Sequence, residues 1–401
     1  MKVAFINSVS GYGSTGRIVE QLATMQGITG KIYYGRKKNF AHTAAYRMTS
    51  FWGNVEHACK TYLLDQHGFA NGAETKRMIQ DLAAFQPDLI HLHNLHGYYL
   101  HVGILFSYLQ KAAIPVIWTF HDCWPFTGHC AHFESVDCMQ WRSQCTNHCP
   151  ALLHYPTSWN SFHVAANFAR KKALFTSLPA QALTIVTPSD WLKRQVEQSF
   201  LKKYAIRVIP TGIDLSLFKP TKTDFRTTNG IGDRFLMLAV ASVWTKEKGL
   251  EDLVAFARSL REDEAMVIVG LSQAQRQRFA KTGVIALGRV ENVSALCGLY
   301  TAADVLINPT YEDTFPTVNL EAQACGCPVV TWQTGGSPDS LSRLTGMVMN
   351  KGDQKALREA LAIMKGRNKE KTKEACIQNA AGYTSLRMLN AYAKLYGEKV
   401  K

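Results

Sequence analysis

The stretch YEDTFPTVNLEAQACGCPVV, residues Tyr311 to Val330, is the most informative part of this sequence of 401 residues. It follows a short apolar run and the breaker Pro309, so it lies just beyond the end of an expected strand. Pro316 and Thr317 are favourable residues for the start of a helix. The free N–H groups and the positive dipole end of such a helix start are suited to binding a phosphate.

Two carboxylates, Asp313 and Glu321, flank this expected phosphate site. Asp313 precedes the helix, and Glu321 lies within it eight residues later. Because Thr317 and Glu321 are four residues apart, they share one face of the helix. Carboxylates accept hydrogen bonds from hydroxyl groups such as those of a sugar. The stretch therefore indicates a binding site for a nucleotide sugar.

Short apolar runs alternate with helical segments on either side of this stretch. Strands are expected in two series, at 2–6, 31–34, 89–92, 115–120, 183–187 and 207–209, and then at 235–240, 266–269, 284–287, 305–307 and 328–331. Helical periodicity occurs between them, for example at 15–25, 165–177, 250–260 and 354–364, and in a last helix at about 385–397. Such alternation is typical of parallel sheets covered by helices on both faces. The sequence therefore predicts an α/β protein with two doubly wound, Rossmann-like domains.

The boundary between the two domains is expected near Pro210. We assign residues 1–207 to an N-terminal domain with a Cys-rich insertion at 123–150, and residues 208–380 to a C-terminal domain. Residues 381–401 form a last helix, which we expect to pack back on the N-terminal domain. The polar segment Thr221–Asp233 has no periodicity and is expected to be a loop.

The composition indicates a basic protein with ample apolar residues for two cores. The net charge is +14, and residues 1–207 hold 20 Lys and Arg against 11 Asp and Glu. This basic N-terminal half could bind a membrane surface, a phosphorylated acceptor or nucleic acid. The alternative is that its charges form an ordinary solvated surface. No signal-peptide pattern and no run of about 18 apolar residues occurs. We therefore expect a cytoplasmic protein that could be peripheral to a membrane.

The glycine-rich stretch SGYGSTGR, Ser10–Arg17, separates the first strand from the first helix. Gly13 and Gly16 allow close approach of the backbone to a phosphate or sugar, and Ser14 or Thr15 can cap the helix. The stretch formally matches GxGxxG, but the second strand is followed by Arg and Lys instead of an acid, which argues against NAD more than against NADP. A simple tight turn is the structural alternative.

Histidines follow two further strands of the N-terminal half. HLHNLHG begins at His91, and WTFHD ends with His121 and Asp122. The carboxyl ends of parallel strands present the chemistry of such sheets. His93 and Asn94 are expected to form hydrogen bonds with substrate rather than to bind a metal, because no carboxylate or Cys lies nearby. His121 is a candidate general base or sugar ligand, with a histidine at the edge of the core as the alternative.

The insertion after WTFHD concentrates cysteines. Cys130, Cys138, Cys145 and Cys149 lie within twenty residues. Four thiolates suit a structural zinc ion, although only the last spacing falls in the usual range. Free thiols and disulfides are the alternatives. In each case the loop follows His121 directly and could shape the acceptor side of a site.

The stretch AVASVWTKEKGL, Ala239–Leu250, follows the first strand of the second half. Lys246 and Lys248 lie just before a helix, where an ammonium group could neutralise a departing diphosphate. A solvated lysine is the alternative. Since Asp313 follows another strand of the same sheet, we expect these lysines near the carboxylates.

With these residues in place, the chain resembles the retaining glycosyltransferases of family 4, which have the GT-B architecture of two Rossmann-like domains facing across a cleft. The resemblance covers nearly the whole chain and includes GYGSTGR, WTFHD, TPSDWLK at 187–193, VIPTGIDLSLFKP at 208–220, the lysine before Gly249, and Asp313 and Glu321 with ACGCPVV. HLHN and the Cys-rich loop resemble a bacterial polysaccharide-biosynthesis branch.

The resemblance implies roles for matching residues. Glu321 would bind the ribose of a nucleotide, Asp313 the hydroxyls of the donor sugar, and Lys248 the diphosphate. His121 would contact the sugar near the reacting carbon, with His93, Asn94 and Asp122 on the acceptor side. The remaining donor-binding candidates are Gly13, Thr15, Gly16, Ser242, Lys246, Phe315, Pro316 and Thr317. The N-terminal domain would bind the acceptor and the C-terminal domain the nucleotide-sugar donor, with retention and without a cofactor or metal at the reaction centre.

Two positions depart from the family pattern. The first carboxylate is Asp313 where the family has Glu. Because the shorter acid should change the contacts with the sugar, the sugar preference of relatives is not carried over to this chain. Ser242 stands where the family often has Arg, and Lys246 is a candidate replacement.

We therefore expect a hexosyltransferase-type enzyme that extends a capsule, lipopolysaccharide or other surface polysaccharide on a saccharide or lipid-linked acceptor. The alternatives are another GT-B activity such as a sugar-nucleotide epimerase, a basic nucleic-acid-binding protein, and an inactive sugar-binding relative. A nucleic-acid partner is not expected, because no known nucleic-acid motif occurs.

Overall fold

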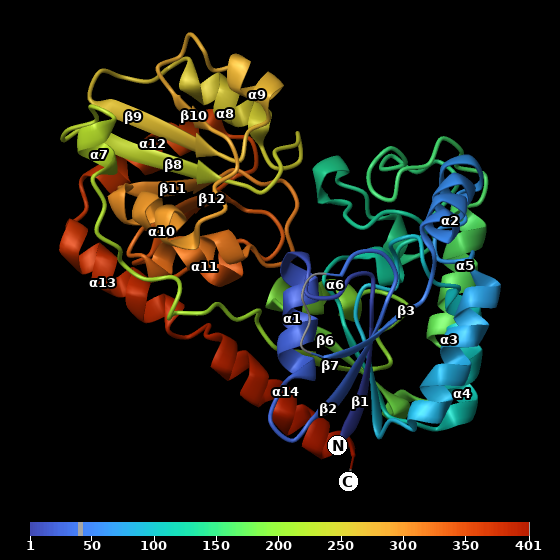
Figure 1. The fold of residues 1–401 in the computed structure, drawn as a ribbon. Helices are drawn as coiled ribbons and strands as arrows, with labels where there is room; N and C mark the ends of the chain where they lie inside the picture. The colour runs from blue at the N-terminus through green and yellow to red at the C-terminus, as the bar shows by residue number, and fades with distance from the viewer. Residues whose placement is uncertain (39–42, 401) are drawn as a thin grey trace. The chain divides into compact units, whose positions relative to one another are not determined.

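The computed structural model describes residues 1–38 and 43–400, which form two compact units (Figure 1). Unit 1 comprises Met1–Ile209 and Leu389–Lys401, and unit 2 comprises Pro210–Met388. The end of the last helix thus belongs to the same unit as the N-terminus. Unit 1 is therefore built from two separate pieces of the chain.

The sheet of unit 1 has seven parallel strands in the order β3-β2-β1-β4-β5-β6-β7. Their bounds are β1 Lys2–Asn7, β2 Thr29–Tyr34, β3 Ala44–Arg47, β4 Leu89–Leu92, β5 Val116–Thr119, β6 Leu183–Thr187 and β7 Ala205–Val208. The strand order reverses direction between β1 and β4, and ligands of doubly wound sheets bind beyond the carboxyl ends of the strands at this point. The glycine-rich loop follows β1, and HLHN follows β4.

The helices of unit 1 cover its sheet, and α3, α4 and α5 pack side by side (Figure 1). Their bounds are α1 Gly13–Ala23, α2 Phe51–Leu64, α3 Gly72–Phe85, α4 Val102–Ala112, α5 Val164–Phe175 and α6 Asp190–Glu197. The final helix α14 spans Ser385–Lys399. Ile90 and Leu92 of β4 join the core beneath α3, α4 and α5. His91 between them points to the other face, because side chains alternate along a strand.

Unit 2 has six parallel strands in the order β10-β9-β8-β11-β12-β13. Their bounds are β8 Phe235–Val240, β9 Glu264–Val269, β10 Ile285–Leu287, β11 Val305–Asn308, β12 Val329–Trp332 and β13 Gly346–Met349. The helices are α7 Phe225–Thr228, α8 Leu250–Ala257, α9 Gln273–Gln277, α10 Val293–Ala302, α11 Thr317–Ala324, α12 Gln354–Lys365 and α13 Lys369–Ala380. Here the switch point lies between β8 and β11.

Strand β8 shows why the apolar runs of unit 2 are nearly continuous. Met237 and Ala239 pack in one core with residues of α8 and α12, whereas Leu236 and Leu238 pack in another with residues of α10. A strand buried on both faces needs apolar residues at every position. The expected α/β class with two Rossmann-like units is confirmed by these two sheets.

Three elements differ from the expectation. Strands β3 and β13 were not expected, because each is a short edge strand of four residues that includes exposed positions. The expected loop Thr221–Asp233 contains the one-turn helix α7. Within the described residues, no helix combines the length and the apolar character needed to span a bilayer.

Candidate active site

The candidate residues of unit 2 lie on two loops, which follow β8 and β11 at the switch point of its sheet. The Tyr311 N–H donates to the Glu247 carbonyl at 2.7 Å and so ties the loops together. Lys248 completes this connection from the first loop to the second. Its Nζ lies 2.7 Å from Asp313 Oδ2 and donates to the Glu312 carbonyl at 3.3 Å. The expected proximity of Lys248 and Asp313 is thus present in the structure.

Gly249 explains how the two loops come so close. Its φ is +80°, and a Cβ at this position would lie 2.1 Å from the carbonyl oxygen of Pro309. Only glycine adopts this conformation without strain and leaves space for the neighbouring carbonyl. The Lys-Gly pair therefore has a structural cause, since the glycine lets the loop carrying Lys248 lie against the end of β11.

The start of α11 has the properties expected of a phosphate site. Pro316 is the N-cap residue and makes no side-chain capping bond, so its side chain satisfies none of the N–H groups that a helix start leaves without an intrahelical partner. The Phe315 N–H, however, donates to Asp313 Oδ1 at 3.1 Å. The Phe315 ring is buried and packs against the Tyr383 ring with centroids 5.7 Å apart.

Glu321 is oriented by two hydroxyl groups. Thr317 Oγ1 donates to Glu321 Oε1 at 3.2 Å, and Tyr300 OH donates to Oε2 at 3.3 Å. Burial and the nearby charge of Glu321 raise the pKa of Tyr300 well above its usual range, so its proton stays in place. Tyr300 was missed by the sequence reasoning, because nothing in the apolar helix Val293–Ala302 marks it as a partner of Glu321.

Ser242 and Lys246 lie on the same loop as Lys248 and are both exposed. Lys246 acts electrostatically on Glu251, whose pKa is lowered chiefly by its hydrogen bond with Arg278 and to a smaller extent by Lys246. Of the two lysines, Lys248 is the one whose ammonium group is bonded to the Asp313 loop.

In unit 1, the glycine-rich loop makes a tight connection from β1 to α1. Gly16 lies against the loop, since a Cβ there would meet the Gly11 nitrogen at 3.2 Å. Gly13 has φ +66° with open space around it. Helix α1 begins at Gly13 with Tyr12 as N-cap and no capping side chain. The expected caps Ser14 and Thr15 are therefore wrong, because both residues lie inside the first turn.

His93 and His121 form a stacked pair at the ends of β4 and β5. His93 Nδ1 and His121 Nε2 are 3.0 Å apart, and the ring planes differ by 17°. Burial lowers the pKa of His121 to about 4 and that of His93 well below its ordinary value. Both rings are thus neutral at pH 7, and one donates to the other. His93 Nε2 is buried and has no hydrogen-bond partner.

Asp122 and Asn94 occupy different environments. The Asp122 carboxylate is buried, 2.6 Å from His96 Nε2, and accepts from the Trp124 N–H at 3.0 Å. Burial opposes its ionisation, but these contacts hold its pKa below the ordinary value. Asn94 is half-buried, and its backbone N–H donates to Asn7 Oδ1 at 3.3 Å. Of the three expected acceptor-side residues, Asn94 is the one that is not buried.

Helix α14 packs on the face of the unit 1 sheet that carries His91. His91 Nδ1 lies 2.7 Å from Tyr396 OH, and its Nε2 lies 2.8 Å from Thr119 Oγ1. Tyr392 OH lies 2.9 Å from the same Thr119 oxygen. His91, the first of the three histidines in HLHNLHG, is thus part of the protein interior.

The expected zinc site in the Cys-rich insertion is not supported. No group of three or more His, Cys, Asp or Glu among residues 1–38 and 43–400 could hold a metal ion. None of the ten cysteines of the chain, all of which lie among the described residues, forms a disulfide bond. A hydrogen bond between Cys130 and Cys149 lowers the pKa of the latter, and Cys145 accepts from the Gly128 N–H at 3.2 Å. Cys130 and Cys145 pack in the core of unit 1 together with the aromatic rings of the insertion. Cys138, the remaining expected ligand, packs against this core from a half-buried position.

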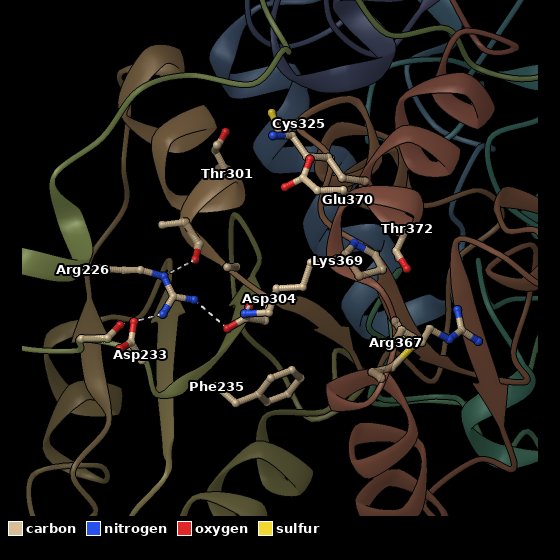
Figure 2. Close-up of a pocket in the computed structure, with 17 residues that line it drawn as sticks. Arg226, Asp233, Phe235, Thr301, Asp304, Cys325, Arg367, Lys369, Glu370 and Thr372 are labelled. Carbon is tan, nitrogen blue, oxygen red and sulfur yellow. Dashed lines mark hydrogen bonds and ion pairs between the residues drawn. The ribbon is translucent and has the colours of Figure 1, made fainter.

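Unit 2 also has a cavity of about 370 Å³, which is lined by charged residues (Figure 2). Phe235, Asp304 and Pro328 place it at the amino ends of β8, β11 and β12, opposite to Lys248. Within it, Asp304 accepts from Arg226 and from Lys369, each at 2.6 Å. Because these charges are paired with each other and ligands bind at carboxyl ends, the Lys248 end is the candidate active site.

Two family models match the two units in turn. The model described as Glycosyltransferase Family 4 matches residues 50–217, and the one described as Glycosyl transferases group 1 matches residues 234–364. The chain belongs to the family 4 glycosyltransferases. The second match spans the loops that carry Lys248 and Asp313. The first spans His93 and His121 of this glycosyltransferase.

Similar proteins agree with this assignment. WcaC of Escherichia coli K12, named as a glycosyl transferase of colanic acid biosynthesis, is 24% identical over 83% of this chain and 82% of its own. TuaC of Bacillus subtilis, named for teichuronic acid biosynthesis, is 31% identical over 42% of this chain and 44% of its own. HepE of Anabaena, solved with UDP, shares the fold of the glycosyltransferase with a TM-score of 0.69 and 15% identity, over 99% of this chain and 100% of that one.

Proposed function

We propose that the protein is a retaining hexosyltransferase that moves a sugar from a nucleoside diphosphate to a saccharide or lipid-linked saccharide in the biosynthesis of a surface polysaccharide. The contact of Lys248 with Asp313 beside the start of α11 carries this proposal. The names of WcaC and TuaC support a polysaccharide product, and the UDP bound to HepE supports a nucleotide-sugar donor.

The donor would bind unit 2 through its nucleotide and diphosphate. Glu321, held by Thr317 and Tyr300, presents a carboxylate to the ribose hydroxyls. N–H groups at the start of α11 and the ammonium group of Lys248 bind the diphosphate. Asp313 then exchanges part of its contact with Lys248 for the hydroxyls of the sugar. Ser242 and Lys246 are exposed candidates for further contacts.

The chemistry would follow from departure of the diphosphate. The bond between the anomeric carbon and the phosphate oxygen breaks, and an acceptor hydroxyl attacks from the same face, so the configuration is retained. Lys248 stabilises the charge that develops on the leaving oxygen, and that oxygen receives the proton of the acceptor. The reaction then needs no side chain as general base. His121, neutral and held by His93, would contact the sugar, and Asn94 would contribute to acceptor binding.

A thermal-shift screen over uridine, guanosine and adenosine diphosphate sugars tests the donor site. A bound donor raises the melting temperature by mass action. We expect one nucleotide class to stabilise the wild-type protein and to lose this effect in Lys248→Ala. If no nucleotide sugar shifts the melting temperature, the donor site proposed here is wrong. Product analysis by mass spectrometry with the stabilising donor would then identify transfer.

A further inference from the structure

Helix α2 has its apolar and polar faces reversed. Its buried residues are Gly53, His57 and Thr61, which are spaced four apart on one face and are small or polar. Its exposed side carries five large apolar residues, Phe51, Trp52, Val55, Leu63 and Leu64, with exposed fractions of 65, 75, 36, 55 and 42%, together with Glu56 and Cys59. A surface helix normally turns its apolar face to the core. The reversal indicates that something outside unit 1 covers this face.

A neighbouring loop extends the exposed apolar face of α2. The Trp159 N–H donates to the Tyr62 carbonyl at 2.9 Å, and the two rings have centroids 5.6 Å apart. Leu153, Trp159 and Phe162 are 71, 71 and 75% exposed. We call these three side chains, together with the five exposed apolar side chains of α2, the apolar surface. Figure 1 shows α2 at the edge of unit 1, away from α14.

The chain segment that carries Leu153, Trp159 and Phe162 is basic, which fits an anionic partner. Between Met139 and Lys172 the chain has four basic residues and no acidic one. Of these, Arg142, Arg170 and Lys172 are exposed. On α2 itself, Glu56 is neutralised by an ion pair with Lys60. The surface thus combines large apolar side chains with positive charge and carries no unpaired acid on α2.

A lipid bilayer has both properties that this surface requires. Tryptophan and other aromatic side chains favour the headgroup level of a bilayer, and basic residues are attracted to anionic lipids. Apolar patches of this kind on a soluble unit mark sites of interaction. A second copy of the chain would cover the apolar residues but would bring the same positive charges together.

We propose that the apolar surface inserts into the headgroup region of an anionic bilayer. This inference rests on the proposed function to the extent that a lipid-linked acceptor would be reached from the same membrane. Binding is reversible, because side chains from one helix and one loop bury far less apolar area than a spanning helix. It weakens with salt, because part of the attraction is electrostatic.

Sedimentation with vesicles tests the proposal on the full chain. The probes are vesicles of phosphatidylcholine alone and vesicles with a three-to-one mixture of phosphatidylcholine and phosphatidylglycerol. We expect binding to the mixed vesicles, with a partition coefficient that falls at least about 10-fold in the triple variant Trp52→Ser, Trp159→Ser, Phe162→Ser. The matched control Val243→Ser, Leu344→Ser removes side chains of unit 2 that are 66 and 69% exposed and should bind like wild type.

Two further readouts separate the possible outcomes. Equal binding of the triple variant and the wild type, or no binding to mixed vesicles, would overturn the proposal. A wild-type dimer in solution that becomes a monomer in the triple variant would instead assign the surface to a second copy. Donor-dependent thermal shift should be the same in wild type and triple variant, which verifies folding. Since that shift reports the donor site alone, its absence in both proteins would count against the proposed function and not against the membrane surface.

Discussion

Gly249 is the residue on which the geometry of the unit 2 loops depends most directly. In Gly249→Ala, the added methyl group would collide with the Pro309 carbonyl, and the left-handed backbone would add strain. We expect a loss of about 2–4 kcal/mol in the free energy of unfolding together with weaker donor binding. Denaturant titration measures the first effect, and thermal shift with the donor measures the second.

Gly283 provides the matched control for this substitution. Its φ is +72°, but a Cβ there would have nothing within 4 Å. Gly283→Ala should therefore show the backbone strain alone, about 1 kcal/mol. Equal losses in the two variants would show that the approach of Pro309 does not matter.

Lys248 and Lys246 differ in what their ammonium groups contact, and this difference should appear in donor affinity. Lys248→Ala removes the cation that is bonded to the Asp313 loop, so we expect donor Kd to rise at least about 10-fold. Lys246→Ala tests whether Lys246 takes the place of the arginine found in relatives. An unchanged Kd in Lys246→Ala beside a large change in Lys248→Ala would reject that replacement.

The residues around the site were predictable where their signal is local. The Lys-Gly pair and the eight-residue spacing of Asp313 and Glu321 can be read directly from the sequence, and the structure brings Lys248 to Asp313. Tyr300 and Tyr396 could not be found in this way, because they reach Glu321 and His91 through tertiary packing. The zinc interpretation failed because cysteine counts do not reveal that two of the thiols pack among aromatic rings.

At the scale of elements, α14 contributes a hydrogen bond to the interior of unit 1. Tyr396→Phe would leave His91 Nδ1 buried without its partner, so we expect a loss of about 1–3 kcal/mol in the free energy of unfolding. Tyr12→Phe is the control, since Tyr12 is 44% exposed, and should change stability by less than about 0.5 kcal/mol. Chemical denaturation followed by circular dichroism measures both. A loss in Tyr396→Phe as small as in the control would contradict the role of this bond.

Elements buried on both faces were the easiest to predict. Strands such as β8 consist of apolar residues alone and have flanking turn signals, and the expected bounds agree with the structure. Edge strands carry less information: β3 and β13 have only one neighbouring strand each and include exposed positions. Helix α2 could not be interpreted from its sequence, because five of its large apolar side chains are exposed while the polar His57 and Thr61 are buried.

At the scale of the whole molecule, the two units differ in their histidine content. All 13 histidines lie in the part of the sequence before residue 164. Burial lowers the pKa of six of them, namely His57, His67, His91, His93, His101 and His121. The unfolded chain takes up these protons near pH 6.5, whereas the folded unit takes them up only at lower pH. The free energy of unfolding of unit 1 should therefore fall as the pH drops below about 6.5.

The measurement is hydrogen exchange by mass spectrometry at pH values from about 7.5 to 5, corrected for the intrinsic exchange rate. Each displaced histidine contributes up to about 1.4 kcal/mol per pH unit, so we expect a loss of several kcal/mol in unit 1. Peptides of unit 2, which has no histidine, serve as the internal control. Equal loss of protection in both units would contradict the prediction.

The return of α14 to unit 1 also determines when each unit can be completed during synthesis. Unit 2 is continuous, so all of its residues have been synthesised before the last 13 residues of unit 1, Leu389–Lys401, are made. Until then, His91 and Thr119 lack the tyrosine hydroxyls that cover them. The unit whose translation begins first is therefore the one that is completed last. Until α14 has been added, its uncovered sheet face is open to chaperones and proteases.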